Sequence, residues 1–254
     1  MTTLPVELYR NVVHEVARDD LVTLLSTSRV LRSEAERILY ASLWLRLDLP
    51  SDLDRLKWFI QRASRVGKHV RLLSLDSLQF AFSRGLGRDL LDTMRYMENL
   101  ERLGLFSSNF NGEDALLFGL AENPGPPFQL LEFDVEYGSS EGVAQFVATQ
   151  HRMTRFRYSG QCWPLSEVHT PVLRTLSLSI PDSLNMLSSF TALRHLHFHG
   201  STGQLFGGVT TRNHVCLTIV SLVIGKMEHM DDLAIHFPHL KYLETRGAVR
   251  PPLS

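Results

Sequence analysis

The sequence has few cysteines, almost no net charge and no long hydrophobic run, and each absence excludes a class of protein. The two cysteines, Cys162 and Cys216, lie far apart without CxxC spacing, which favours reduced thiols over a disulfide framework or a cysteine zinc site. With 26 basic and 27 acidic side chains the net charge is −1, which argues against a dedicated binder of nucleic acid or anionic membranes.

The chain also has no run of the ~20 apolar residues that a membrane span needs. Pro5 and Glu7 interrupt the apolar stretch that a secretion signal requires. We therefore expect a soluble protein of the cytoplasm, the nucleus or both, without a membrane or nucleic-acid partner. Its 254 residues, 44% apolar and 21% charged, fit one to two globular domains that need no cofactor or metal to stabilise the fold.

Residues 1–45 have the three-to-four spacing of short amphipathic helices. The first helix is expected from Leu4 to about Val16, with one buried stripe made of Leu8, Val12, Val13 and Val16. A second helix carries Leu21, Leu24 and Leu25 and can be capped by Asp19 or Asp20. The third has capping-box spacing at Ser33 and Glu36, or begins a turn earlier at Ser28. Such a small head needs a neighbour or a partner to bury enough surface.

Residues 46–254 repeat a six-residue pattern in which positions one, four and six are apolar. The pattern begins every 20 to 30 residues at Val70-Leu73-Leu75, Leu100-Leu103-Leu105, Phe128-Leu131-Phe133, Met153-Phe156-Tyr158, Leu173-Leu176-Leu178, Leu193-Leu196-Phe198, Ile219-Leu222-Ile224 and Leu240-Leu243-Thr245. Stretches with helical spacing lie between the patterns, including one around Leu53 and Leu56 and one around Val143 and Phe146. We predict an α/β fold in which each strand stacks on the next as an irregular leucine-rich-repeat-like solenoid with a parallel sheet.

The opening LPVELYRNVVHEVARDDLVTLLSTSRVLRSEAERILYASLWL resembles an F-box, especially the fungal variety in which LPxEL precedes DL, SR and EAxxxLY. An F-box followed by leucine-rich repeats is similar to the substrate-receptor subunits of Skp–cullin–F-box ubiquitin ligases. The resemblance implies a non-catalytic protein whose head binds the Skp adaptor, and through it the cullin, while its repeats bind a protein substrate. It places the adaptor contact on Leu4, Pro5, Glu7, Leu8, Val12, Leu21 and Leu24.

The sequence departs from that family in two respects. Regular repeats often carry an asparagine eight positions after the first leucine, and none of these positions holds one here, so we do not expect an evenly curved horseshoe. The last pattern is followed by RPPLS without a polar cap, which is expected of a natural short form or an incomplete gene product.

The residues that alternate with the apolar triplets should face the exposed, concave side of the sheet. They offer a polar surface of mixed charge, suited to a protein ligand, and the candidates for substrate contact are Glu132, Asp134, Arg155, Arg157, His195, His197, His199, Tyr242 and Glu244. Opposite charges on neighbouring strands should partly neutralise each other.

Three other motifs favour different chemistry only weakly. The histidines at 195, 197 and 199 alternate along one strand, and the ~6.5 Å between successive side chains is too wide for one metal ion. Gly138-Ser139-Ser140-Glu141-Gly142 matches the G-x-S-x-G of serine hydrolases, with Asp231 or Asp232 and His236 or His239 as partners, but no glycine-rich oxyanion motif precedes it. The basic cluster at Arg62, Arg65, Lys68, His69 and Arg71 lacks the interleaved aromatics of a nucleic-acid site.

The favoured hypothesis is a non-enzymatic ligase receptor that is monomeric outside its complex. The alternatives are a leucine-rich-repeat scaffold that never engages a ligase and, more remotely, a serine hydrolase.

Overall fold

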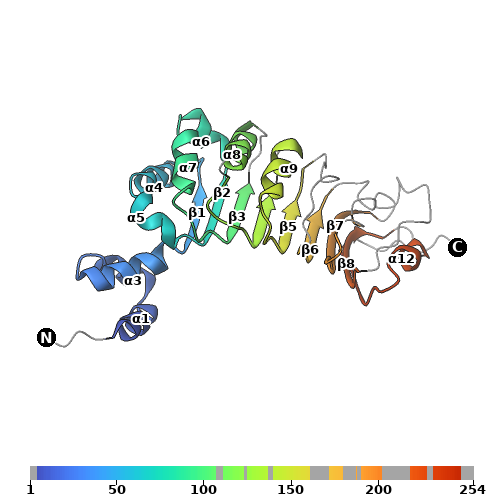
Figure 1. Ribbon diagram of the computed structural model, residues 1–254, viewed down its shortest axis with the longest axis horizontal. Helices are drawn as coiled ribbons and strands as arrows, with labels where there is room; N and C mark the ends of the chain where they lie inside the picture. Colours follow the sequence, from blue (N-terminus) through green and yellow to red (C-terminus); the bar gives the residue numbers. More distant parts are fainter. Residues whose placement is uncertain are drawn as a thin grey trace.

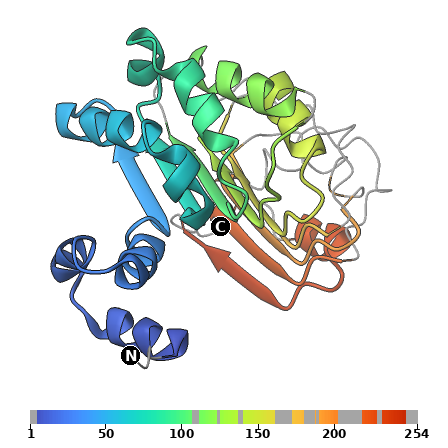
Figure 2. The same cartoon turned by 60° about the vertical axis from the view of Figure 1, so that its left-hand side comes forward.

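The protein has an α/β fold built on one parallel sheet, as Figures 1 and 2 show. The structure is a computed structural model that describes residues 5–106, 111–122, 125–136, 140–160, 172–179, 187, 190–201, 218–227 and 231–246. Its strands are β1 (Ser42–Arg46), β2 (Leu72–Asp76), β3 (Arg102–Phe106), β4 (Glu132–Val135), β5 (Arg155–Tyr158), β6 (Thr175–Leu178), β7 (His195–Ser201), β8 (Ser221–Lys226) and β9 (Tyr242–Thr245). They lie in chain order, each parallel to the next.

Helices cover one face of this sheet. The helices are α1 (Val6–Glu15), α2 (Arg18–Leu24), α3 (Arg29–Leu39), α4 (Pro50–Ile60), α5 (Ala63–Val66), the 3-10 turn η1 (Gly67–His69), α6 (Gln79–Ser83), α7 (Gly87–Met94), α8 (Asn111–Ala121), α9 (Ser140–Ala148) and α12 (Asp231–His236). In Figure 1, α4 and α6 to α9 lie along the same side of the strands, while α1 and α3 lie apart, at the β1 end. None of the helices in the described ranges is both long and apolar enough to span a bilayer.

The apolar positions of the strands form rows that run across the sheet. Register pairs Leu73 with Leu103, Leu103 with Phe133, and Phe133 with Phe156, and all four are at most 2% exposed. Phe133 packs edge-on against Phe146 of α9, with ring centroids 5.1 Å apart, and stacks on Phe156 at 5.6 Å. The predicted parallel sheet is thus confirmed, and its core lies between the strands and the helices.

Two details of the repeat prediction were wrong. The third pattern was placed at Phe128-Leu131-Phe133, whereas register puts Phe133 opposite Leu103, so the repeat reads Leu130-Phe133-Val135. The error is a shift of two residues, which equals the period of a strand and leaves the predicted exposed face unchanged. Strand β1 was not predicted, and the expected boundary after residue 45 falls inside it. Its signal was the short alternation of buried Leu43 and Leu45 with exposed neighbours.

Backbone groups at the turns are satisfied by glutamine rather than by the asparagine ladder of regular repeats. Gln150 is 1% exposed, and its Oε1 accepts the N–H of Leu130 at 2.8 Å from the preceding repeat. Gln129 accepts the N–H of His151 at 2.8 Å and donates to the carbonyl of Thr149. A buried backbone donor without a partner costs ~1–3 kcal/mol, which applies to the buried N–H of Leu130, so Gln150 stabilises the contact between these two repeats.

The three N-terminal helices have a small core of their own, formed by buried Val13, Leu21 and Ala35. The burial of their side chains corrects the expected stripe of α1. Val13 is 0% exposed, but Leu8 and Val12 are 46% and 57% exposed, so the buried stripe of α1 does not include them. This follows from the 100° turn per residue, which places Val12 and Val13 on different faces.

The caps of the second and third helices also differ from expectation. Helix α2 begins at Arg18, so neither Asp19 nor Asp20 is its N-cap. Helix α3 is capped by Ser28, whose Oγ accepts the N–H of Leu31 at 3.2 Å. The capping box at Ser33 and Glu36 is therefore wrong, and the earlier start is confirmed.

Helix α3 is joined to the sheet-bearing part by charged and aromatic contacts. Glu36, which is 5% exposed, accepts from Arg65 of α5, with 2.9 Å between Oε1 and Nη2. Tyr40 stacks on Trp58 of α4 with centroids 5.7 Å apart, and the guanidinium of Arg62 lies 4.3 Å from the Trp58 ring centroid. The basic cluster noted in the sequence thus holds the α3–α4 junction with at least two of its cations.

Candidate functional site

The face of the sheet away from the helices carries all the predicted substrate-contact residues, and we call it the open face. Its first row is Ser42, Leu72, Arg102, Glu132, Arg155, Thr175, His195, Ser221 and Tyr242; its middle row is Trp44, Ser74, Gly104, Asp134, Arg157, Ser177, His197, Val223 and Glu244. Neighbouring strands are ~4.8 Å apart, so successive members of a row lie beside one another. The sheet therefore brings the predicted residues of β4, β5 and β7 together and places Tyr242 and Glu244 near its last edge.

The open face is not exposed everywhere. Ser74 and Ser177 are 7% and 9% exposed, and Val223 is 8% exposed. The ring of Phe106 covers Gly104 so closely that a Cβ there would lie 2.8 Å from its Cε2. The middle row is thus closed over β2 and β3, and again at Ser177 of β6 and Val223 of β8, and its less buried polar side chains lie on β4, β5 and β7.

A third set of side chains precedes the strands. We call these residues the entry row; they are Arg71, Glu101, Leu131, Thr154, Arg174, Arg194, Val220 and Lys241. Each carbonyl in the row except that of Lys241, which belongs to the last strand, accepts two N–H groups of the next repeat. That of Thr154 accepts from Arg174 at 2.9 Å and Thr175 at 3.0 Å, and that of Arg174 accepts from Arg194 and His195 at the same distances. This repeated pair of hydrogen bonds fixes the backbone position from which each entry-row side chain extends.

Charges over β2 to β4 occur in pairs. In the entry row, Arg71 Nη1 lies 3.8 Å from Glu101 Oε1. In the first row, Arg102 Nη2 lies 3.7 Å from Glu132 Oε1. All four side chains are partly exposed, so each pair contributes little stability, on the order of 0–1 kcal/mol. Their effect is to neutralise Arg71 and Arg102, while Asp134 of β4 adds a further carboxyl group to this part of the open face.

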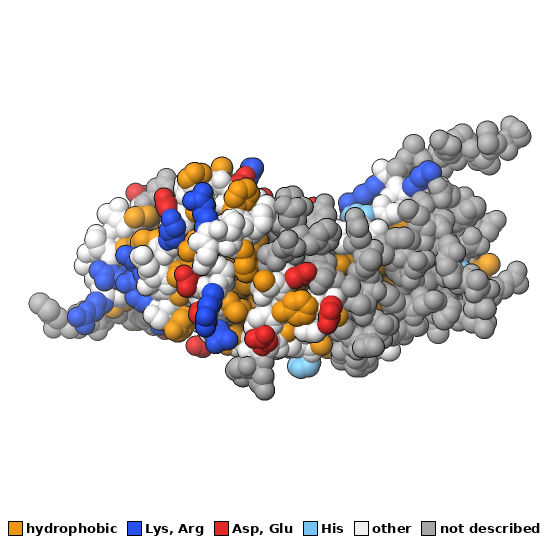
Figure 3. Space-filling view, turned by 90° about the horizontal axis from the view of Figure 1, so that it is seen from above, with side chains coloured by type: hydrophobic (Ala, Val, Ile, Leu, Met, Phe, Trp, Pro, Cys, Tyr) orange, Lys and Arg blue, Asp and Glu red, His pale blue; other side chains and the backbone are white. Residues whose placement is uncertain are grey.

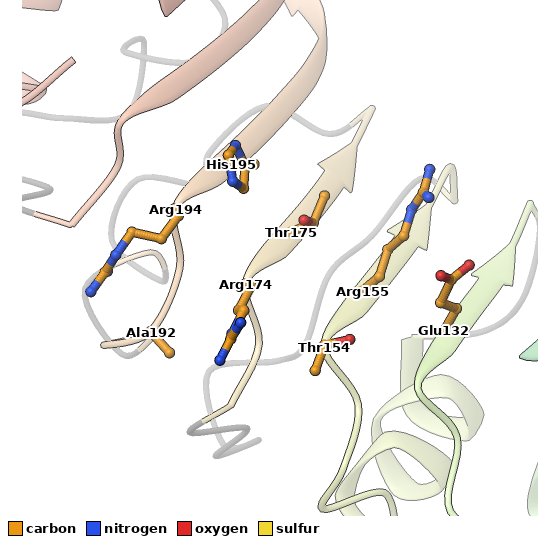
Figure 4. A pocket seen from close by; sticks show the side chains of 8 residues that line it. All are labelled: Glu132, Thr154, Arg155, Arg174, Thr175, Ala192, Arg194 and His195. Atoms are coloured by element: carbon orange, nitrogen blue, oxygen red, sulfur yellow. The ribbon is translucent and has the colours of Figure 1, made fainter. Parts of the chain in front are cut away.

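A hollow of about 660 Å³ lies where the entry row and first row meet over β4 to β7 (Figure 4). Its lining is Glu132, Thr154, Arg155, Arg174, Thr175, Ala192, Arg194 and His195. Figure 4 shows Arg174 and Arg194 extending from the segments just before β6 and β7, and Arg155 on β5. Three arginines and one glutamate thus line the hollow. In Figure 4 the side chains of Arg155 and Arg174 point in opposite directions, and Glu132 is paired with Arg102.

Asp134, in the middle row, is an unsatisfied acid. Its Oδ1 is buried and has no hydrogen-bond partner in the described part of the chain. Burial raises the pKa of Asp134, and the nearby guanidinium groups of Arg157 and Arg155 oppose that rise. Asp134 and Arg157 line a second hollow of about 150 Å³, together with Phe106, Val135, Glu136 and Ser159. A buried polar atom without a partner is uncommon, and it marks this spot as a place where a ligand donor would fit.

The three histidines of β7 share one side of their strand, as predicted. Leu196 and Phe198 between them are buried. His199 Nε2 lies 2.9 Å from Ser177 Oγ on β6. Burial lowers the pKa of His197 and of His199, and the cationic neighbour Arg246 adds to the fall for both.

The described residues add no support for the metal site or the serine hydrolase that motifs in the sequence weakly suggest. Within the described ranges, no three potential ligands among His, Cys, Asp and Glu are grouped as a metal site requires. Gly138 and Ser139 of the G-x-S-x-G match lie outside the described residues, as do the side chains of Ser140, Asp231 and Asp232. The helix-covered side, seen in Figure 3, has basic, acidic and hydrophobic side chains interspersed over its described part.

The head has a second candidate surface. Leu8 and Val12, one turn apart on α1, are about half exposed, and Pro5 and Glu7 beside them are exposed. Leu24 is half-buried, whereas Leu21 is 2% exposed within the head core. Leu4 lies outside the described residues. The exposed candidates are therefore those of α1, and Leu21 supports them from beneath.

Several residues of these surfaces were missed in the sequence. Val22 on α2 and Val30 on α3 are 59% and 44% exposed. Arg174 and Arg194 line the hollow, but they precede their strands and so fall outside the strict alternation that was used to find the open face. A signal did exist: each is the residue directly after the first apolar position of its repeat.

No protein-family model matches the sequence, and the search of curated proteins found no match either. The functional argument therefore rests on the motifs of the sequence and on the geometry of these two surfaces.

Proposed function

We propose that the chain is a substrate-receptor subunit of a Skp–cullin–F-box ubiquitin ligase. In this proposal helices α1 to α3 form an F-box that binds the Skp adaptor. The stacked repeats form a leucine-rich-repeat-like solenoid whose open face binds a protein substrate. The chain itself carries out no chemistry, because the ligase supplies it.

The observation that carries the proposal is the apolar surface left on the head. Four aliphatic side chains, Leu8, Val12, Val22 and Val30, are each 44% to 59% exposed, although the head has its own core. Burying the exposed half of such a side chain is worth about 1 kcal/mol. Leu8 and Val12, which lie one turn apart on α1, would therefore contribute about 2 kcal/mol to binding, roughly thirtyfold in Kd. A partner with an apolar groove is the simplest use of such a surface.

The LPxEL motif falls on the same surface. Pro5 directly precedes α1 and is exposed, and Glu7 is an acidic residue in the first turn of that helix. The residues that the resemblance assigns to adaptor contact and the residues that are exposed thus overlap at Pro5, Glu7, Leu8 and Val12. Leu21 is left out of the proposed contact surface because it is buried.

The test is a pull-down of the full chain with purified Skp adaptor. We expect the wild type to bind and the double variant Leu8→Asp Val12→Asp to lose binding at least a hundredfold, because each change removes apolar contact and brings a charge to the groove. Trp44→Asp is the matched control: Trp44 is 69% exposed but lies on β1, outside the three helices. A wild type that does not bind, or a double variant that binds as well, would favour the repeat scaffold without a ligase.

A further inference from the structure

The smaller hollow of the open face, about 150 Å³ in volume, lies over β3 to β5, and we call it the Asp134 hollow. Its lining is Phe106, Asp134, Val135, Glu136, Arg157 and Ser159. Register places Asp134 between Gly104 of β3 and Arg157 of β5. Gly104 has no side chain that could donate to the carboxyl group, and the ring of Phe106 lies over that glycine instead.

Asp134 contributes an acceptor that the fold leaves unused. Its Oδ1 is shielded from solvent and has no hydrogen-bond partner in the described part of the chain. Arg157 does not fill that role, because none of the ion pairs among the described residues joins it to Asp134. A buried carboxylate oxygen that no donor reaches costs stability, so this residue is poorly suited to folding alone.

The lining favours a cationic donor over a neutral one. It contains two carboxyl groups, from Asp134 and Glu136, and only one guanidinium group, from Arg157. Phe106 adds an aromatic side chain, and the face of an aromatic ring attracts cations. A hydrogen bond between charged groups is also stronger than one between neutral groups.

The size of the hollow and its single free acceptor favour an ammonium group over a guanidinium group. A guanidinium group is a planar fork that matches two acceptor oxygens, whereas a lysine ammonium is a compact charge on a thin methylene stem. The unsatisfied atom of Asp134 is one oxygen, Oδ1. A volume of about 150 Å³ is smaller than that of most ligand pockets and suits the end of one side chain.

We propose that the Asp134 hollow binds the ammonium group of a lysine side chain of the partner protein, with Asp134 Oδ1 as an acceptor. The inference rests on the proposed function to the extent that it takes this lysine to belong to a protein substrate. A free alkylamine carries the same ammonium group, so the test separates these two sources. Arg157 is a like charge in the same lining, so it should weaken the binding of the ammonium group.

The test measures binding of the full chain to three pools of fluorescent nonapeptides whose flanking residues are degenerate but uncharged. The central residue is lysine in one pool, arginine in the second and norleucine, which keeps the methylene stem of lysine without the ammonium group, in the third. We expect the lysine pool to bind about tenfold more tightly than the norleucine pool, since one hydrogen bond to a charged group is worth about that much. The arginine pool should bind less tightly than the lysine pool.

Unlabelled n-butylamine distinguishes a free amine from a protein segment. It should displace the lysine pool only at concentrations about a hundredfold or more above those of unlabelled lysine peptides, because a peptide adds contacts outside the hollow. Equal potency of n-butylamine would overturn the assignment to a protein segment. Equal binding of the lysine and norleucine pools would mean that water alone fills the hollow, and an arginine pool that binds as tightly as the lysine pool would overturn the choice of an ammonium group.

Variants connect the preference for lysine to the hollow. Asp134→Asn keeps the shape of the side chain and removes its charge, so it should abolish the preference. Glu244→Gln is the matched control and should keep it, because Glu244 is an acid of the same row that lies outside the hollow and pairs with Arg246. Arg157→Gln should strengthen binding of the lysine pool. Thermal unfolding checks that each variant keeps the fold; an unaffected Asp134→Asn, an equal loss in Glu244→Gln or weaker binding by Arg157→Gln would each overturn the inference.

The outcome is separable from that of the adaptor test. Lysine binding needs only the open face, and adaptor binding needs only the head. If the adaptor binds and the lysine pool is not preferred, only the role of the Asp134 hollow is wrong. If the lysine pool is preferred and the adaptor does not bind, the role of the hollow stands and the ligase role falls.

Discussion

Strands β2 to β4 and strands β5 to β7 carry cations in the same rows of the open face, yet among the described residues only the cations of the first set form ion pairs within 4.0 Å. Arg71 has Glu101, and Arg102 has Glu132. Arg174 and Arg194 of the second set line the hollow over β4 to β7, and neither forms such an ion pair with any residue that the structure describes. The backbone hydrogen bonding is the same in both sets, because the paired hydrogen bonds to the entry-row carbonyls recur at each strand.

The core beneath the two sets does not change in the same way. Leu73 and Leu103 under the first set, and Phe156 and Leu176 under the second, are all at most 1–2% exposed. The inward positions are constrained by packing, since each side chain must fit the repeat on either side. The exposed positions of the open face, such as Arg155 and Arg174, are not constrained by packing in this way. The difference between the two sets therefore points to binding rather than to folding.

The largest effect should come from breaking the core where the two sets meet. Phe133 of β4 contacts both Phe146 and Phe156, and it is 0% exposed. We expect Phe133→Ala to lower the free energy of unfolding by about 3–5 kcal/mol, measured by urea denaturation. Tyr242→Ala is the control, because Tyr242 is 69% exposed and should cost less than about 0.5 kcal/mol. Comparable losses in the two variants would contradict a continuous core.

A smaller change in the free energy of unfolding, an increase instead of a decrease, is expected when Asp134 is replaced. Burial raises its pKa, so the folded state binds its proton more tightly than the unfolded chain does. The stability linked to this proton is present below the unfolded pKa of about 3.9 and is lost as the pH rises through the folded pKa. At pH 7 the charged group, with Oδ1 unsatisfied, is therefore a cost.

Asp134→Asn should remove that cost and raise the free energy of unfolding at pH 7 by about 1 kcal/mol. The gain should shrink when the unfolding is repeated near pH 4. Glu244→Gln is the matched control, because Glu244 is an exposed acid of the same row that pairs with Arg246 at 3.2 Å. A variant less stable than the wild type at pH 7 would mean that Arg157 already compensates the carboxylate.

The sequence was sufficient to predict the sheet because its signal is repeated. The apolar position held by Leu73, Leu103 and Leu196 recurs in every strand, in the register that stacking requires. A repeat that is misplaced by two residues, such as the third, therefore still has the correct side chains facing the core. Strand β1 was missed because it follows α3 without a turn signal and opens no pattern of its own. The exposed stripe of α1 was misassigned because Val12 and Val13 are adjacent aliphatic residues, and a helix can bury either one.

The open face was less predictable than the core. Alternation located Glu132, Arg155 and His195 correctly on it, since period two is enough to choose a face. It did not locate Arg174 and Arg194, because the chain bends as it enters each strand and alternation fails there. Which cations have anions beside them depends on side chains from neighbouring repeats, about 20 to 30 residues apart in sequence. No local pattern records that pairing.

The smallest expected effect concerns the histidines that follow the hollow on β7. Burial, and then neighbouring cations including Arg246, lower the pKa of His197 and His199. The unfolded chain therefore takes up these protons first, and stability falls as the pH drops below the unfolded value of about 6.5. His197→Gln removes one of these rings, so it should make the free energy of unfolding less dependent on pH between 7.5 and 5.5.

Urea denaturation of the wild type and of His197→Gln at both pH values measures this difference. His151→Gln is the control, because His151 is exposed and lines a different hollow, between α8 and α9. An unchanged pH dependence in His197→Gln would show that burial and the cations near β7 do not disfavour the protonated ring of His197 in the folded chain.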